Sequence, residues 1–147
     1  SVESKVDGGL IPVPPPGPAP SKVAVEGTWK SGCTSQDGFF QVEEMVFEGE
    51  TFHTTATLFQ NSTCTGTPMF EAKVDGTFKV IAASIAVAGG SDVDVTMADP
   101  QTGQVGKYMW VVLVKNGKLY LPPTSHDSKA SRANSVDKSK PYAKVGG

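Results

Sequence analysis

Apolar and polar residues alternate in short runs along most of the chain after Val23. In the clearest run, Val93, Val95 and Met97 are separated by polar residues, and an alternation of period two places the two sets of side chains on opposite faces of a strand. The segment Lys107–Val114 is apolar on both faces, which is typical of a central strand. The pattern therefore predicts a protein built mainly of strands.

Short connections that suit hairpins separate these runs. Gly49 and the pair Asp75-Gly76 are predicted to form tight turns, and Asn116-Gly117 is the strongest hairpin signal. No helix is predicted, apart from one irregular turn within Ser125–Ser135. The predicted strands are Ala24–Lys30, Phe39–Glu48, Thr51–Gln60, Met69–Val74, Thr77–Ala88, Asp92–Ala98, Lys107–Val114, Lys118–Leu121 and Pro141–Val145.

Consecutive strands joined by hairpins form a meander, and a meander removes its free edges by closing into a barrel. We therefore expect an all-β fold, a small antiparallel up-and-down barrel of about eight strands, with a β-sandwich as the alternative. Large side chains dominate the expected interior, so a filled core is favoured over a wide cavity. The expected interior residues are Phe39 or Phe40, Phe47, Phe59, Phe70, Ile81, Ile85, Tyr108, Trp110 and Val112.

The first residues of the chain have a different composition. The segment Ile11–Pro20 is rich in proline, which lacks the backbone N–H that a strand ladder needs and favours an extended polyproline II conformation. We expect residues 1–22 to be a proline-rich disordered tether and residues 23–147 to be a single β-barrel domain.

The chain contains two cysteines, Cys33 and Cys64, each flanked by polar residues. Buried free cysteines usually have apolar neighbours, so a disulfide is favoured over two unpaired thiols. A disulfide indicates an oxidising compartment, either secreted or in the periplasm and cell envelope of a bacterium.

Charge and hydropathy narrow the classes of partner. The formal net charge is −2 with 13 Lys and Arg among 147 residues, which argues against a protein that binds nucleic acid. No apolar run reaches the roughly 18 residues of a membrane-spanning helix. Contact with a membrane is expected only through a lipid anchor that would precede Ser1 in the native protein.

Candidate catalytic groups are few. His126 lies beside Ser125, Asp127 and Ser128, but neighbours in sequence rarely form a catalytic triad, because the three groups must converge from different directions. Strand alternation places Asp92 and Asp94 on one solvated face, and their spacing does not match a calcium-binding loop. We expect no enzyme activity, no metal site and no cofactor.

The motif Gly27-Thr28-Trp29 is similar to the Gly-x-Trp signature of lipocalins and other calycins. The order of the later motifs also resembles a group of small exported bacterial β domains, many of them lipoproteins. In the lipocalins the tryptophan packs across the barrel floor and an arginine stacks on it, which implies these roles for Trp29 and Arg132. The motifs of the bacterial group correspond here to Gly27-Thr28-Trp29, Cys33, Phe47 with Phe52, Cys64, Leu119-Tyr120, Arg132 and Tyr142.

These features together predict a non-enzymatic, exported, envelope-associated domain that binds a macromolecular partner. The alternative is a lipocalin-like carrier of a small apolar ligand. The expected ligand-binding residues are Trp29, Tyr108, Trp110 and Arg132, and the tail Ser125–Gly147 and the loop Asp99–Gly103 are expected to contact a protein partner.

Overall fold

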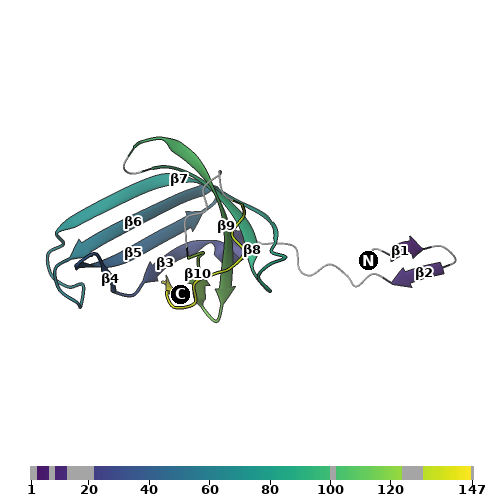
Figure 1. Ribbon diagram of the computed structural model, residues 1–147, viewed down its shortest axis with the longest axis horizontal. Helices are drawn as coiled ribbons and strands as arrows, with labels where there is room; N and C mark the ends of the chain where they lie inside the picture. Colours follow the sequence, from purple (N-terminus) through teal and green to yellow (C-terminus); the bar gives the residue numbers. More distant parts are fainter. Residues whose placement is uncertain (1–2, 7–8, 13–21, 100–101, 124–130, 147) are drawn as a thin grey trace.

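Strands make up nearly all of the regular structure, as the alternation in the sequence predicts (Figure 1). The computed structural model describes residues 3–6, 9–12, 22–99, 102–123 and 131–146. Among these residues there is one short helix, α1 (Lys22–Val25). The strands are β1 (Glu3–Val6), β2 (Gly9–Pro12), β3 (Gly27–Ser31), β4 (Thr34–Gln36), β5 (Phe39–Glu48), β6 (Thr51–Phe59), β7 (Phe70–Ala83), β8 (Ser91–Ala98), β9 (Val105–Lys115), β10 (Lys118–Tyr120) and β11 (Tyr142–Val145).

The main sheet closes on itself. It contains nine strands in the order β3-β11-β10-β9-β8-β7-β6-β5-β4, and β3 also pairs with β5. Eight strands therefore form a closed antiparallel up-and-down barrel, and β4 is an additional strand at one end of β5. This confirms the predicted barrel and excludes the sandwich.

Aromatic side chains fill the interior. The Phe47 ring lies with its centroid 5.0 Å from that of Phe52 and 5.0 Å from that of Phe78, and Phe52 in turn meets Trp110 edge to face at 5.7 Å. Such tilted and edge-on contacts add to the free energy gained by removing the rings from water. The core residues are Val25, Trp29, Met45, Phe47, Phe52, Phe78, Val93, Val95, Trp110, Val112, Leu119, Leu121 and Tyr142.

The expected interior was only partly right. Phe47, Trp110 and Val112 belong to the core, and Tyr108 packs against it. Phe59 is buried but lies on the outer side of the barrel wall, in a hollow beside Cys64. Four expected interior residues are exposed instead, namely Phe39, Phe70, Ile81 and Ile85.

Strand β7 differs from the expectation in two ways. Phe78 lies in the core and Val80 packs against it, so alternation directs Ile81 outward, and the pairing with β8 also shifts register between Val80 and Ala82. The predicted turn at Asp75-Gly76 is also wrong, because β7 runs unbroken through Gly76. A Cβ at that glycine would lie 2.1 Å from the carbonyl oxygen of Thr96, so the glycine permits β8 to approach closely rather than turning the chain.

The first predicted strand of the barrel also differs from the structure in its boundaries. The predicted strand Ala24–Lys30 begins as helix α1, and β3 starts at Gly27, whose φ of 129° suits glycine. Strand β4 was not predicted.

Within the predicted tether, β1 and β2 pair as an antiparallel hairpin. The remaining prolines of this segment, Pro14, Pro15, Pro16, Pro18 and Pro20, lie outside the described residues. The predicted turn at Ser125–Ser135 lies largely outside them too, and residues 131–135 have no regular secondary structure.

Strands β5, β6 and β7 extend together past one end of the barrel, and β7, with 14 residues, is the longest of the described strands (Figure 1). Strand β8 pairs with β7 only from Gly76 onward, which leaves the first residues of β7 beyond the closed part. We call this extension the projecting sheet, formed by β4, Phe39–Gln41, Ala56–Phe59 and Phe70–Val74.

The predicted disulfide is present. Cys33 and Cys64 are bonded, with their Cα atoms 5.8 Å apart, so the bond joins the segment between β3 and β4 to the β6–β7 connection. Asn61 organises that connection, because its Oδ1 accepts hydrogen bonds from the backbone N–H groups of Thr63 and Thr65. None of the described helical residues forms a segment long and apolar enough to cross a membrane.

Replacing both cysteines, C33S/C64S, is expected to lower the free energy of unfolding by about 3–4 kcal/mol, because the unfolded chain regains the freedom that the closed loop removes. Urea titration of both proteins followed by tryptophan fluorescence measures the difference. Equal midpoints would contradict this role for the bond.

Candidate functional site at the barrel mouth

A hollow of about 220 Å³ opens at the end of the barrel from which the projecting sheet extends. The residues around it come from β5, β9, β11 and the segments after β10. They are Glu43, Met45, Trp110, Leu121, Pro122, Pro123, Asp137, Lys140 and Tyr142. We call this hollow the mouth.

Buried core residues form the floor of the mouth. Met45, Trp110, Leu121 and Tyr142 are all buried core residues, and strand alternation directs them to the barrel interior. The mouth therefore does not lead into a deeper cavity, because the same side chains that form its floor fill the barrel beneath it.

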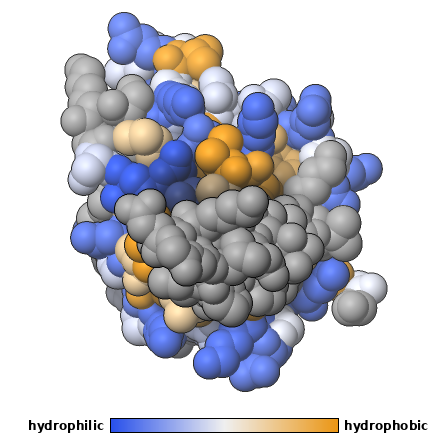
Figure 2. Space-filling view, turned by 90° about the vertical axis from the view of Figure 1, so that its right-hand side faces the viewer, coloured by the Kyte–Doolittle hydropathy of each residue, from blue (hydrophilic) through white to orange (hydrophobic). Residues whose placement is uncertain are grey.

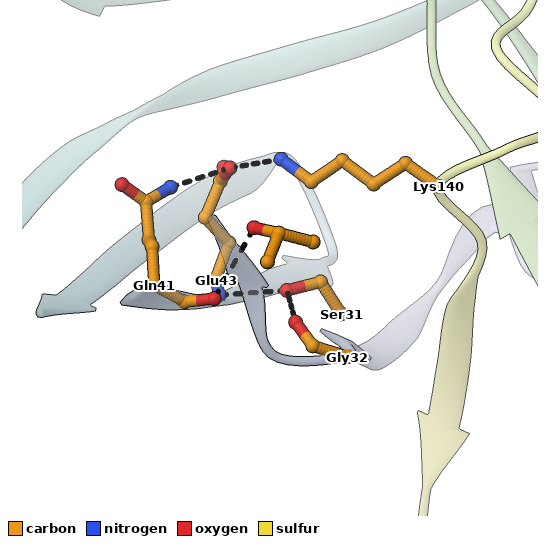
Figure 3. Close-up of polar contacts among 6 residues, drawn as sticks. Ser31, Gly32, Gln41, Glu43 and Lys140 are labelled. Carbon is orange, nitrogen blue, oxygen red and sulfur yellow. Dashed lines mark hydrogen bonds and ion pairs between the residues drawn. The ribbon is translucent and has the colours of Figure 1, made fainter. Parts of the chain in front are cut away.

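The rim of the mouth is polar and centred on Glu43 (Figure 3). The Glu43 carboxylate accepts a hydrogen bond from the Gln41 amide at 2.8 Å and forms an ion pair with Lys140. Its backbone N–H donates to Ser31 Oγ, and that hydroxyl donates to the Gly32 carbonyl. The side chains of Glu43 and Lys140 are 19% and 31% exposed, so the pair is reachable from solvent but held in place.

Tyr142 on the floor of the mouth and Asp137 beside it have opposite shifts in pKa. Burial and the nearby Glu43 carboxylate raise the pKa of the Tyr142 phenol, so it is protonated at neutral pH. Hydrogen bonds from the Ser139 hydroxyl and backbone N–H lower the pKa of Asp137. The mouth thus combines a neutral phenol, an ion pair and a further carboxylate around an apolar floor.

The size of the mouth limits what it can hold. Pockets that enclose a whole small-molecule ligand usually measure about 300–1,000 Å³, and the mouth is smaller, at about 220 Å³. It suits a single side chain or a group of similar size.

The inner face of the projecting sheet continues from the mouth and is apolar at its tip. By alternation, Phe39 shares the face of Glu43 and Met45, and Phe70 lies opposite Leu58 in the β6–β7 register. Phe39 is 42% exposed, Met69 46% and Phe70 60%. Large apolar side chains grouped on a surface often mark an interaction site. Figure 2 shows the side of the molecule away from this sheet, where hydrophilic residues dominate the described surface and hydrophobic areas are separate.

The structure separates the four predicted ligand-binding residues. Trp110 forms part of the mouth, and Tyr108 lies on the same strand and packs against the core. Trp29 is only 1% exposed, and its indole N–H donates to the Val25 carbonyl oxygen at 2.8 Å. The cation placed over the Trp29 ring is Lys144, 5.7 Å from the ring centroid, in place of the arginine that the lipocalin resemblance implied.

Arg132 lies on the outer face of the barrel. Its guanidinium donates to the Trp110 carbonyl oxygen at 3.1 Å and to the Asp94 carboxylate at 2.5 Å. Lys107 also pairs with Asp94, at 3.0 Å. Burial acts to raise the pKa of Asp94, but the hydrogen bonds and positive charges of Lys107 and Arg132 outweigh it and lower that pKa. Arg132 therefore ties the C-terminal segment to β8 and β9.

Other candidate groups lie away from the mouth. His53 Nδ1 contacts Asp75 Oδ1 at 2.6 Å on exposed positions of neighbouring strands, and His126 lies outside the described residues. Among the described residues, no cluster of His, Cys, Asp and Glu has the arrangement of a metal site.

Sequence reasoning missed Glu43 and Lys140 as members of the site. They are 97 residues apart in the chain, and no motif connects them. Asp137 and Lys140, which line the mouth, belong to the C-terminal tail that is expected to contact a partner, and that expectation stays a prediction.

Comparison with known proteins identifies no relative, because the chain matches no family model, no curated protein and no solved structure.

The Asp94 cluster leads to a prediction about pH. Folding lowers the pKa of the Asp94 carboxyl, so its charge stabilises the folded protein fully at pH values above the unfolded-state pKa of about 4. This stabilisation is lost as the pH falls through the lower folded-state pKa. Asp94→Asn is expected to be less stable than the wild type by about 1–2 kcal/mol at pH 7, and the difference should shrink toward pH 3.

Urea titration at both pH values measures this effect, with Asp92→Asn, on the same strand and face, as the control. A difference that stays constant from pH 7 to pH 3 would show that the charge of Asp94 is not its cause.

Proposed function

We propose that this chain is a non-enzymatic binding domain that contacts a protein partner through the mouth and the inner face of the projecting sheet. The observation that carries this proposal is the presence of a small apolar-floored hollow and of exposed aromatic residues at the same end of a filled barrel.

The composition of this surface supports a protein partner. Aromatic and methionine side chains are enriched at the centres of protein interfaces, and a polar rim usually surrounds them. Here Phe39, Met69 and Phe70 supply exposed apolar area, while Glu43 and Lys140 supply a polar rim. In the proposed complex, one apolar side chain of the partner enters the mouth and the projecting sheet covers the residues beside it.

The filled interior argues against the alternative of a carrier. Carriers of this barrel class hold their ligand inside the barrel. In this chain Phe47, Phe52 and Phe78 occupy that interior. An apolar ligand would need these rings to move, at the cost of the contacts that hold the barrel together.

We also propose that the domain works outside the cytoplasm, as an exported and lipocalin-like module of a cell envelope. The disulfide supports an oxidising compartment. The Gly-x-Trp start of the barrel supports the likeness to lipocalins, since Trp29 packs in the core at its first strand.

Native mass spectrometry of the protein recovered from its own source under non-denaturing conditions tests the class of partner. A protein-sized adduct is expected. An added mass of a few hundred daltons that is lost on unfolding would instead identify a carrier and overturn the proposal.

Once a partner is isolated, Phe39→Ser is expected to weaken its affinity by at least about tenfold, because truncating a central aromatic contact typically costs more than 1 kcal/mol. Isothermal titration calorimetry measures the change. Ile85→Ser is the matched control, since Ile85 is fully exposed beyond the opposite end of β7. Equal losses in the two variants would refute the assignment of the surface.

A further inference from the structure

Among the residues that the structure describes, one edge of β7 has no strand partner along the projecting sheet. Residues Phe70–Asp75 pair with β6 on one side, whereas on the other side the pairing with β8 begins at Gly76. Among the described residues, this six-residue stretch therefore has a strand partner on one side only. An open edge presents unpaired N–H and C=O groups that can accept another strand.

The ladder shows which residues present those groups. The Phe78 N–H donates to the Glu50 carbonyl oxygen at 3.0 Å, on the β6 side of β7. The β6–β7 register is unbroken from Thr77 to Phe70, and backbone groups alternate in direction along a strand. The N–H and C=O groups of Glu71, Lys73 and Asp75 therefore point toward the open edge.

We propose that this edge pairs with the same edge of a second copy of the chain, antiparallel about a two-fold axis at Ala72. In this register Glu71 of each copy forms a hydrogen-bonded pair with Lys73 of the other. Both pairs carry opposite charges, and opposite charges directly across a ladder stabilise it. A two-fold axis repeats the same contact on both copies, as in most homodimers.

Charge selects this register over its neighbours. A two-fold axis at Lys73 places the two lysines opposite each other and Glu71 opposite Asp75, and an axis at Glu71 places the two glutamates together. Like charges directly across a ladder are destabilising. An axis at Val74 pairs Lys73 with Asp75 but moves Glu71 opposite Thr77, which already pairs with β8.

The same register also brings apolar residues of the two copies together on the other face of the strand. Phe70 of one copy then lies across from Val74 of the other, and the two Ala72 residues face each other. Phe70 is 60% exposed in the single chain, so pairing removes apolar surface from water. Because the contact involves six residues of each copy, the dimer belongs to the small, transient class of interfaces.

Sedimentation equilibrium of the full chain from about 1 μM to about 1 mM, a range that covers transient interfaces, tests the proposal through charge reversal. The wild type is expected to show a reversible monomer–dimer equilibrium. Lys73→Glu and Glu71→Lys alone should each weaken it by at least about tenfold, since both cross-strand pairs become repulsive. The double variant E71K/K73E should restore it, and an equimolar mixture of the two single variants should form a heterodimer.

Lys115→Glu and Glu48→Lys are matched controls, because they make the same charge changes at exposed positions away from this edge. A wild type that stays monomeric throughout the range would overturn the proposal. So would single variants that dimerise as well as the wild type, or a double variant and a mixture that fail to associate. The binding proposal above is tested separately, since Phe39 lies on β5 and not on this edge.

Discussion

The pairing of β3 with both β5 and β11 is the constraint on which the rest of the structure depends. Trp29 lies opposite Met45 on one side of β3 and opposite Lys144 on the other, so the first and last strands of the barrel meet around its indole ring. Closure at this seam removes the free edges of the meander. It also brings the side chains of all eight strands toward one interior.

The interior of a small closed barrel is either filled by side chains or holds a ligand. Aromatic side chains fill the interior of this barrel. Phe47, Phe52 and Phe78 contact one another or Trp110 across the barrel, and the mouth lies at one end of this filled core. Because the core is filled, the proposed binding function relies on the rim and the outer surfaces of the barrel. The ion pair of Glu43 and Lys140 is half-buried at that rim.

The unequal lengths of the strands create both of the proposed surfaces. Strand β7 has 14 residues and β8 has eight, so β7 extends beyond its neighbour and exposes an inner face and an edge. The disulfide anchors the connections at this end of the molecule, where the extended strands have fewer neighbours to hold them.

Much of the architecture could be predicted because it is encoded locally. Alternation located β5, β6 and β8 closely, and the hairpin at Asn116-Gly117 was recognised from two residues whose positive φ angles suit that turn. Predictions were wrong where the same residue type is compatible with two different local structures. Gly76 indicated a turn by its type, but it serves close packing of β8 against β7.

The sequence by itself determined the fold class, the strand content and the cysteine pairing, because each depends on residue type and spacing along the chain. Only the tertiary structure showed that the register of β7 against β8 shifts between Val80 and Ala82, and that the first residues of β7 extend beyond their pairing with β8. It alone placed Glu43 beside Lys140 and Arg132 beside Asp94. Those contacts join residues that are distant in sequence, and barrel closure, not any local pattern, brings them together.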